Sequence, residues 1–189
     1  MTDLPFSCRC GQVKGTLHDA RPNTGTHVRC FCSSCRAAMI HTGDPDPGDQ
    51  GVTLFQTTPD KISFQQGQDR LAVFSFGPKN ILRWQASCCN AALFTTLRSP
   101  KIPLAALIIR RLADATAIGP VKAQAFVPQP DGTRQHQGKM ALFGGVLWRG
   151  LIARLTGRWR NTPFFDIKTR TPTAPVTVLT KETRTNLIG

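Results

Sequence analysis

Seven cysteines fall in three short groups along this chain of 189 residues. The groups are Cys8 and Cys10, then Cys30, Cys32 and Cys35, then Cys88 and Cys89. In an extended strand, side chains two positions apart point to the same face, so a Cys-x-Cys pair can offer two sulfurs to one ion. A Cys-x-x-Cys pair offers two sulfurs from a tight turn. The spacing therefore predicts metal sites, and sulfur-only ligand sets favour Zn²⁺ over Fe–S clusters.

The number of cysteines indicates how they divide between ions. Structural zinc is closed by four protein ligands, whereas catalytic zinc keeps one position open beside three. We predict two Zn²⁺ per chain, with a closed site formed by Cys8, Cys10, Cys88 and Cys89 and an open site formed by Cys30, Cys32 and Cys35. Cys88 and Cys89 can share an ion only if the chain turns there, because neighbours on a strand face opposite ways. The alternative is that the cysteines are buried as small hydrophobic residues.

Three stretches carry these cysteines, namely CRCGQVKG at 8–15, CFCSSCR at 30–36 and ASCCNAAL at 86–93. They resemble the motifs C-x-C-G-x-V-x-G, C-x-C-x-x-C-R and C-x-x-C-G-x-x-L/F of the glutathione-dependent formaldehyde-activating enzyme family, which also includes centromere protein V. In the third stretch, Ala86 and Asn90 stand where the family has Cys and Gly, and Cys88 is additional. We expect Cys88 to take over the missing ligand role. The resemblance covers residues 5–115.

The resemblance implies a fold and a chemistry. The fold would be a zinc-pinned β-tent of small antiparallel sheets, with a structural site made by the first and third motifs. The middle motif would make an exchangeable or catalytic site. The family's reaction joins glutathione to formaldehyde, and many members carry only the broader description of carbon–sulfur lyase. The expected function is therefore a carbon–sulfur lyase or thiol-adduct enzyme that acts on glutathione or a similar small thiol with an aldehyde.

Outside the cysteines, Arg36 is the residue that we expect to take part in catalysis. A guanidinium can donate two parallel hydrogen bonds to a carboxylate, so Arg36 could hold a carboxylate of the substrate. The alternative is a solvated arginine beside a turn. His41 could move protons, although a lone histidine is more often structural or exposed. Asp44, Asp46 and Asp49 lie in a loop rich in Pro and Gly, and we expect them only to be solvated.

The elements that position these residues should be strands. The chain holds 16 Gly and 14 Pro but a single Glu, which favours short strands and loops over long helices. Residues 6–18 predict a strand or hairpin arm, SSCR predicts a turn, and 102–115 fit either a buried strand or a short helix. Five further short apolar runs follow one another closely, VTLFQT, KISFQQG, LAVFSFG, ILRWQA and ALFTTL. The short spacing between these runs predicts a mainly β, antiparallel core.

The chain changes character after this core. We predict a zinc-binding domain at 1–118 and a basic extension at 119–189, with an irregular tail from Lys168. Leucines four positions apart indicate an amphipathic helix near 140–158. Arginines accompany them at 149, 154, 158 and 160. The formal net charge is +13, and everything from Leu71 onward holds seventeen Lys and Arg against four acids.

The basic extension supports an alternative function. A non-catalytic, zinc-stabilised module could bind nucleic acid or, peripherally, an anionic membrane through this half. Binding to nucleic acid would weaken steeply with salt, which a gel shift at two salt concentrations measures, and vesicle flotation measures membrane binding. The apolar run before Arg149 is too short for a transmembrane span. No secretory signal is visible at the start, so the expected location is cytoplasmic, where clustered cysteines bind metals more often than they form disulfides.

Overall fold

The computed structural model describes residues 2–189 and is mainly β, as the sequence predicts. Within that range twelve strands form two sheets. The strands are β1 (Leu4–Ser7), β2 (Lys14–Leu17), β3 (Thr26–Cys30), β4 (Val52–Thr57), β5 (Ile62–Gln66), β6 (Leu71–Ser75), β7 (Leu82–Ala86), β8 (Ala92–Thr96), β9 (Ala105–Ile108), β10 (Ala123–Pro128), β11 (Arg134–Gln137) and β12 (Val176–Val178). The helices are α1 (Ser33–His41), α2 (Gly145–Leu155) and α3 (Lys181–Asn186), with a π-helical turn at Met140–Gly144 and 3₁₀ turns at Gly48–Gln50, Pro59–Lys61, Gln68–Arg70, Ile109–Arg111, Thr116–Ile118 and Arg158–Arg160.

The smaller sheet has the antiparallel order β1-β2-β5. Its first two strands are the hairpin predicted at residues 6–18, with Phe6 opposite Gly15. A Cβ atom at Gly15 would overlap the ring of Phe6, so the close approach of the strands requires glycine there. The loop of this hairpin carries the first cysteine motif.

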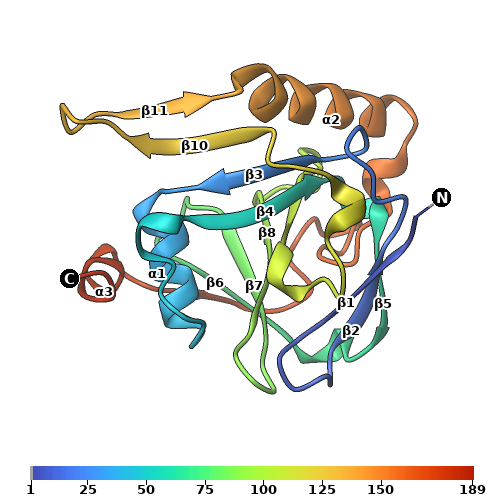
Figure 1. The fold of residues 1–189 in the computed structure, drawn as a ribbon. Coiled ribbons are helices and arrows are strands. Elements are labelled where there is room, and N and C mark those ends of the chain that lie inside the picture. Colours follow the sequence, from blue (N-terminus) through green and yellow to red (C-terminus); the bar gives the residue numbers. More distant parts are fainter. Residues whose placement is uncertain (1) are drawn as a thin grey trace.

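The larger sheet has the order β11-β10-β3-β4-β9-β8-β7-β6-β12. Its central strands pair antiparallel, but β10 pairs with β3 and β12 pairs with β6 in parallel. The sheet is therefore larger than the small antiparallel sheets expected, because segments after residue 119 add β10 and β11 at one edge (Figure 1) and β12 at the other. The segment 102–115, for which a strand and a helix were both considered, contributes β9 at the centre.

An aromatic cluster packs the two sheets together. Phe6 of the small sheet meets Phe94 of the large sheet edge to face, with ring centroids 5.1 Å apart. Phe164, from the segment after α2, packs edge to face on Phe94 and at a tilt on Trp84, with ring centroids 5.2 and 5.1 Å away. All four side chains are almost fully buried, so this cluster holds the core of the fold.

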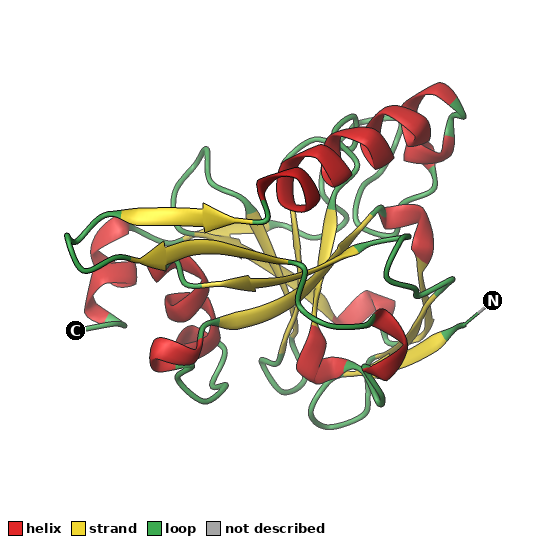
Figure 2. Cartoon of the chain, turned by 45° about the horizontal axis from the view of Figure 1, so that its top comes forward, coloured by secondary structure: helices red, strands yellow, loops and turns green. Residues whose placement is uncertain are grey.

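Two helices frame the middle cysteine motif. The sequence predicts only a turn at SSCR, but these residues begin α1, whose buried face packs on Phe74 and Phe76. The π-helical turn before α2 contacts β10 and β3, and α2 contacts β4, so that this helical segment lies along one side of the large sheet (Figure 2). Its position agrees with the amphipathic helix predicted near 140–158.

The tail is more ordered than the sequence predicts. Beyond Lys168 the chain forms β12 and α3, and α3 contacts α1 (Figure 1). Leu187 and Ile188 pack on the Phe74 and Phe76 cluster. Searched over the residues that the structure describes, no helix is both long and apolar enough to cross a membrane.

Candidate metal centres

The first and third cysteine motifs meet at the junction of the two sheets. The sulfur atoms of Cys8, Cys10, Cys88 and Cys89 all lie within 4.8 Å of one another. Cys8 and Cys10 are 3.6 Å apart, and Cys88 lies 3.8 and 3.4 Å from them. Four Zn–S bonds of about 2.3 Å at tetrahedral angles place sulfurs about 3.8 Å apart. The four side chains can therefore hold a metal ion.

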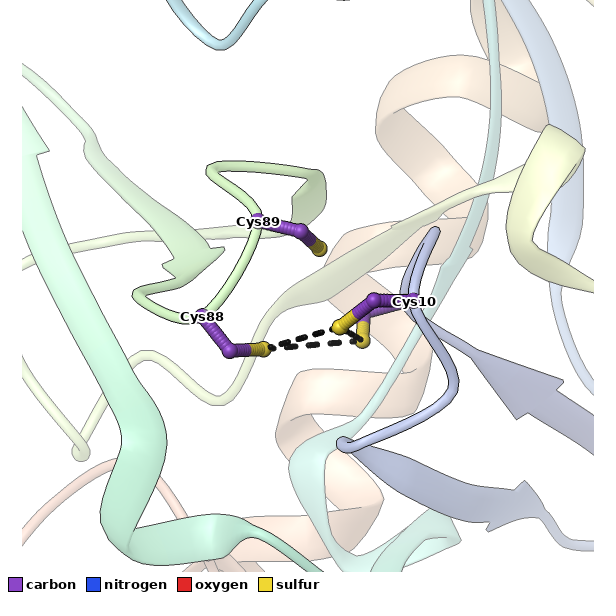
Figure 3. A group of neighbouring side chains, drawn as sticks. Cys10, Cys88 and Cys89 are labelled. Atoms are coloured by element: carbon purple, nitrogen blue, oxygen red, sulfur yellow. Dashed lines mark hydrogen bonds between the residues drawn. The ribbon is translucent and has the colours of Figure 1, made fainter.

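A turn brings the two neighbouring cysteines to one centre. Residues 87–89 form the turn between β7 and β8, so Cys88 and Cys89 no longer face opposite ways. Figure 3 shows both side chains reaching from this turn toward Cys10. Asn90 has a φ of 56°, a left-handed conformation that glycine adopts readily and asparagine tolerates. This explains why asparagine can replace the expected glycine.

The crowding of these thiols affects their ionisation. Burial first, and then the sulfurs of Cys10 and Cys8, raise the pKa of Cys88 to about 12. Burial also acts on Cys89, but the backbone N–H groups of Ala91 and Cys10 outweigh it and lower its pKa to about 6. Neighbouring thiols therefore resist carrying charge together, and a cation among them would relieve that repulsion.

The middle motif forms a second group. Cys30 ends β3, Cys32 is the N-cap of α1 and Cys35 lies in its first turn. Their sulfurs lie within 4.8 Å of one another, with 3.4 Å between Cys30 and Cys32. The Cys32 sulfur also accepts the Cys35 backbone N–H at 3.3 Å. Three sulfurs at a helix N-terminus, where thiolates are favoured, can hold a metal ion and leave a position open to another ligand.

A cavity of about 440 Å³ lies against this second group, and all three cysteines line it. Its other walls come from β3, β4, β8, β9, β10 and the segment that begins α2. His136 lines the cavity as well, and its Nδ1 accepts the Phe126 backbone N–H at 3.3 Å. In the neutral ring the proton then lies on Nε2.

A buried arginine faces the three-cysteine group. Arg83 is 5% exposed, and both terminal nitrogens of its guanidinium lie 3.7 Å from the Cys35 sulfur. They also donate to Ser34 and Thr95 at 2.9 and 3.3 Å. Hydrogen bonds from Cys30 and Cys32, aided by the charge of Arg83, hold the pKa of Cys35 well below its usual range.

The charge of Arg83 fits a metal site. None of the ion pairs formed among residues 2–189 includes Arg83, so no carboxylate balances it. A buried charge needs a partner of opposite sign. Three thiolates around a divalent cation carry one net negative charge, which the guanidinium would offset. Arg83 thus supports the metal-bound form of the three-cysteine group.

We expect Arg83→Met to weaken metal binding at the three-cysteine group by about 10- to 100-fold, because outer groups that stabilise ligands typically contribute that much. Competition with a chromophoric chelator measures the affinity. Arg83→Lys should lose less, because it keeps the charge. Arg29→Met is the matched control, since it removes an exposed cation beside Cys30. Equal losses for the Arg29 and Arg83 variants would contradict the proposed role.

The other residues singled out in the sequence lie away from the cavity. Arg36 donates from Nε and Nη2 to the two carboxylate oxygens of Asp46 at 2.8 and 2.7 Å, and both side chains are partly exposed. Its catalytic role stays a prediction. His41 packs on Phe74 with ring centroids 4.6 Å apart, and burial lowers its pKa. Asp44 was expected to be solvated, which is wrong, because it is buried and paired with arginines.

Two features of the second site were not predicted from the sequence. Arg83 lies in β7 and His136 in β11, far along the chain from the middle motif. Neither is part of a cysteine motif, and only the pairing of strands brings them close. The sequence offers one weak signal for Arg83, which is a charged residue between two apolar residues of the same strand, the buried Leu82 and Trp84.

Comparison with known proteins gives a family but no described activity. A family model described as a family of unknown function, DUF6151, matches residues 1–167. No curated protein matches the chain. A crystal structure of a Rhodobacter sphaeroides protein from a structural genomics effort is similar, with a TM-score of 0.45 and 18% sequence identity. The match covers 62% of this chain and 96% of that protein.

Proposed function

The chain belongs to the family of unknown function DUF6151. We propose that it is a zinc-binding enzyme that forms or cleaves carbon–sulfur bonds. It would join a small thiol to an aldehyde, or cleave the adduct. Glutathione is the thiol, and formaldehyde the aldehyde, that the resemblance of the three cysteine motifs implies. The four-cysteine group would hold a structural Zn²⁺, and the three-cysteine group a second Zn²⁺ that takes part in the reaction.

One observation carries this proposal, the inequality of the two cysteine groups. The four-cysteine group joins loops of the two sheets and is complete in sulfur ligands. The three-cysteine group has one sulfur fewer, and each of its cysteines lines a cavity large enough for a small molecule. Closed sites suit structural metals, and open sites suit catalysis.

The chain's own residues would serve the reaction in distinct ways. Zn²⁺ bound by Cys30, Cys32 and Cys35 would favour the thiolate form of a substrate thiol at neutral pH. In the addition, the sulfur forms a bond to the carbonyl carbon, the C=O π bond breaks, and the thiol proton ends on the oxygen. Among residues 2–189, His136 is the only titratable side chain other than the cysteines that lines the cavity. Its Nε2–H would donate a hydrogen bond to the oxygen as negative charge develops there, while the thiol proton reaches that oxygen through solvent, and cleavage runs the same step backwards.

Turnover by a Cys32→Ser variant tests the proposal. The protein is incubated with formaldehyde and with glutathione or benzyl mercaptan in separate reactions, and NMR follows adduct formation above the uncatalysed rate. Wild type should accelerate at least one reaction, and Cys32→Ser should lose at least about 100-fold of that rate. It should also lose one zinc per chain on metal analysis.

The variant should remain folded, so that the loss reports on chemistry. Cys32 caps α1 through its sulfur, and serine is among the preferred N-cap residues. Circular dichroism checks the fold. No acceleration by wild type with either thiol, at two zinc per chain, would sink the enzymatic proposal.

A further inference from the structure

Building on the proposed function, we propose that the thiol bound beside Cys30, Cys32 and Cys35 carries an apolar group, which the adjoining cavity holds. The substrate class would then be hydrophobic thiols or their aldehyde adducts, in place of glutathione. The composition of the cavity wall, its lack of charge and the position of the cysteines support this class.

The wall of the cavity is formed mostly by carbon. Aliphatic and aromatic side chains reach it from the large sheet, the loops around Ile81 and Leu104, and the start of α2. Those besides the cysteines are Val28, Leu54, Ile81, Leu97, Leu104, Ala106, Ala125, Phe126, Leu142, Phe143, Val146 and Leu147. The volume is about 440 Å³, whereas an apolar cavity of about 150 Å³ already takes benzene.

The cavity wall lacks charge. Over the described part of the chain, no Lys, Arg, Asp or Glu side chain lines it. Glutathione carries two carboxylates and an ammonium group, and each would lose water there without an ionic partner. Such burial is costly, so the wall disfavours glutathione and favours a molecule whose polar atoms are few.

Besides the cysteines and His136, the polar side chains of the wall are amides and hydroxyls, which carry no charge. They are Gln56, Thr95 and Thr96, and the Oε1 of Gln56 is buried and accepts no hydrogen bond from residues 2–189. One such acceptor suits a single donor, such as the hydroxyl of a hemithioacetal. The three cysteines then fix where the sulfur of the ligand would lie.

The mouth of the cavity is formed by a segment outside the resemblance. Phe143 precedes α2, and Val146 and Leu147 lie in its first turn. Phe143 and Leu147 are 49% and 73% exposed, although both also line the cavity. The apolar character of the binding site thus depends partly on residues specific to this extension.

Isothermal calorimetry on the zinc-loaded protein with three probes tests the proposal. The probes are benzyl mercaptan, glutathione, and toluene as the apolar probe without sulfur. We expect benzyl mercaptan to bind about 10- to 100-fold more tightly than glutathione, because its ring leaves water for the apolar wall whereas glutathione must desolvate charged groups. Glutathione binding as tightly as benzyl mercaptan would overturn the proposal.

Variants locate the binding. Val146→Trp adds bulk at the mouth and should weaken benzyl mercaptan binding at least tenfold, without changing the zinc content. Leu151→Trp is the matched control, since Leu151 lies on the same helix, exposed and away from the cavity wall. Ala106→Phe adds a ring at a buried position of the cavity wall and gives a second variant should the first misfold. Unchanged binding in both Val146→Trp and Ala106→Phe would overturn the proposal.

Toluene separates this inference from the proposed function. If benzyl mercaptan binds wild type much more tightly than toluene does, but binds Cys32→Ser no more tightly than toluene, the result supports both the apolar cavity and the thiol site at the cysteines. Equal binding of toluene and benzyl mercaptan, with glutathione weaker, supports the apolar cavity but contradicts a thiol site at the cysteines.

Discussion

Replacing Cys10 with serine should remove one metal ion per chain and lower the melting temperature by about 10–20 °C. Structural zinc contributes about 10–16 kcal/mol of apparent binding free energy in small zinc-dependent peptides. A domain with its own core depends less on the ion, so we take half of the lower value, about 5 kcal/mol, as the expected loss of unfolding free energy. For a chain of this size, each 1 kcal/mol shifts the melting temperature by about 2–4 °C. Metal analysis and thermal denaturation measure the two losses.

The position of Cys10 makes this substitution a clean one. Its side chain is exposed, so serine leaves no cavity in the core. Its sulfur lies 3.4 Å from that of Cys88, across the junction between the hairpin of the small sheet and the β7–β8 turn of the large sheet. Loss of the ion would therefore free two loops that otherwise hold the sheets together.

Cys32→Ser is the matched control for this experiment. It also removes one sulfur from a metal group, but serine can keep the cap of α1, and β3 remains paired on both sides. The expected result is the loss of one metal ion with a melting temperature close to that of the wild type. If Cys32→Ser is destabilised as much as Cys10→Ser, the division into a structural and an open site is wrong.

The cysteine groups could be predicted because their spacing is local. Two sulfurs in CRCG and three in CFCSSC are brought close by a few backbone angles, whatever the rest of the fold does. Grouping the first motif with Cys88 and Cys89 needed the count of ligands and the resemblance as well. The structure brings those four together because the chain turns directly after β7, at the point where the sequence required a turn.

The cavity could not be predicted in this way. Its wall combines strands that are remote in sequence, and the parallel pairing of β10 with β3 decides which side chains meet Cys30. Nothing in the pattern of residues 119–189 indicates that pairing. The start of α1 was also missed, because SSCRAAMIH has little apolar periodicity and looks like a turn. Tertiary contacts with Phe74 and Phe76 stabilise this helix.

Asp44 shows the same limit for a charged residue. In the sequence it stands among Asp, Pro and Gly, which are typical of a solvated loop. In the fold its side chain is 3% exposed and bonds to Arg111, which is 8% exposed. Arg9 and Arg110 approach the same oxygen at 3.4 and 3.5 Å. The burial of Asp44 could not be predicted because the three cations come from two segments remote from it in sequence, the loop at Arg9 and the turn at Arg110 and Arg111.

Asp44→Asn should therefore cost about 3–5 kcal/mol of unfolding free energy at neutral pH, the usual range for breaking a buried ion pair. The substitution leaves Arg111 buried without its partner, although the guanidinium keeps its bond to the Ala92 carbonyl at 2.8 Å. Such a loss is a large share of the 5–15 kcal/mol typical of whole domains. Urea denaturation at pH 7 measures it. Asp46→Asn is the control and should change stability little, because Asp46 and its partner Arg36 are partly exposed.

The effect of Asp44→Asn should also depend on pH, with a definite sign. Burial raises the pKa of Asp44, but the hydrogen bond and charge of Arg111 outweigh it, so the folded pKa lies below the ordinary value. The stabilisation is thus fully present above the unfolded pKa of about 3.9 and is lost as the pH falls through the lower folded value. Wild type and Asp44→Asn should differ most at pH 5–7, and the difference should shrink as the pH falls below about 3.9 toward the lower folded pKa. A difference that stays constant down to pH 2 would mean that the carboxylate charge is not what holds this junction.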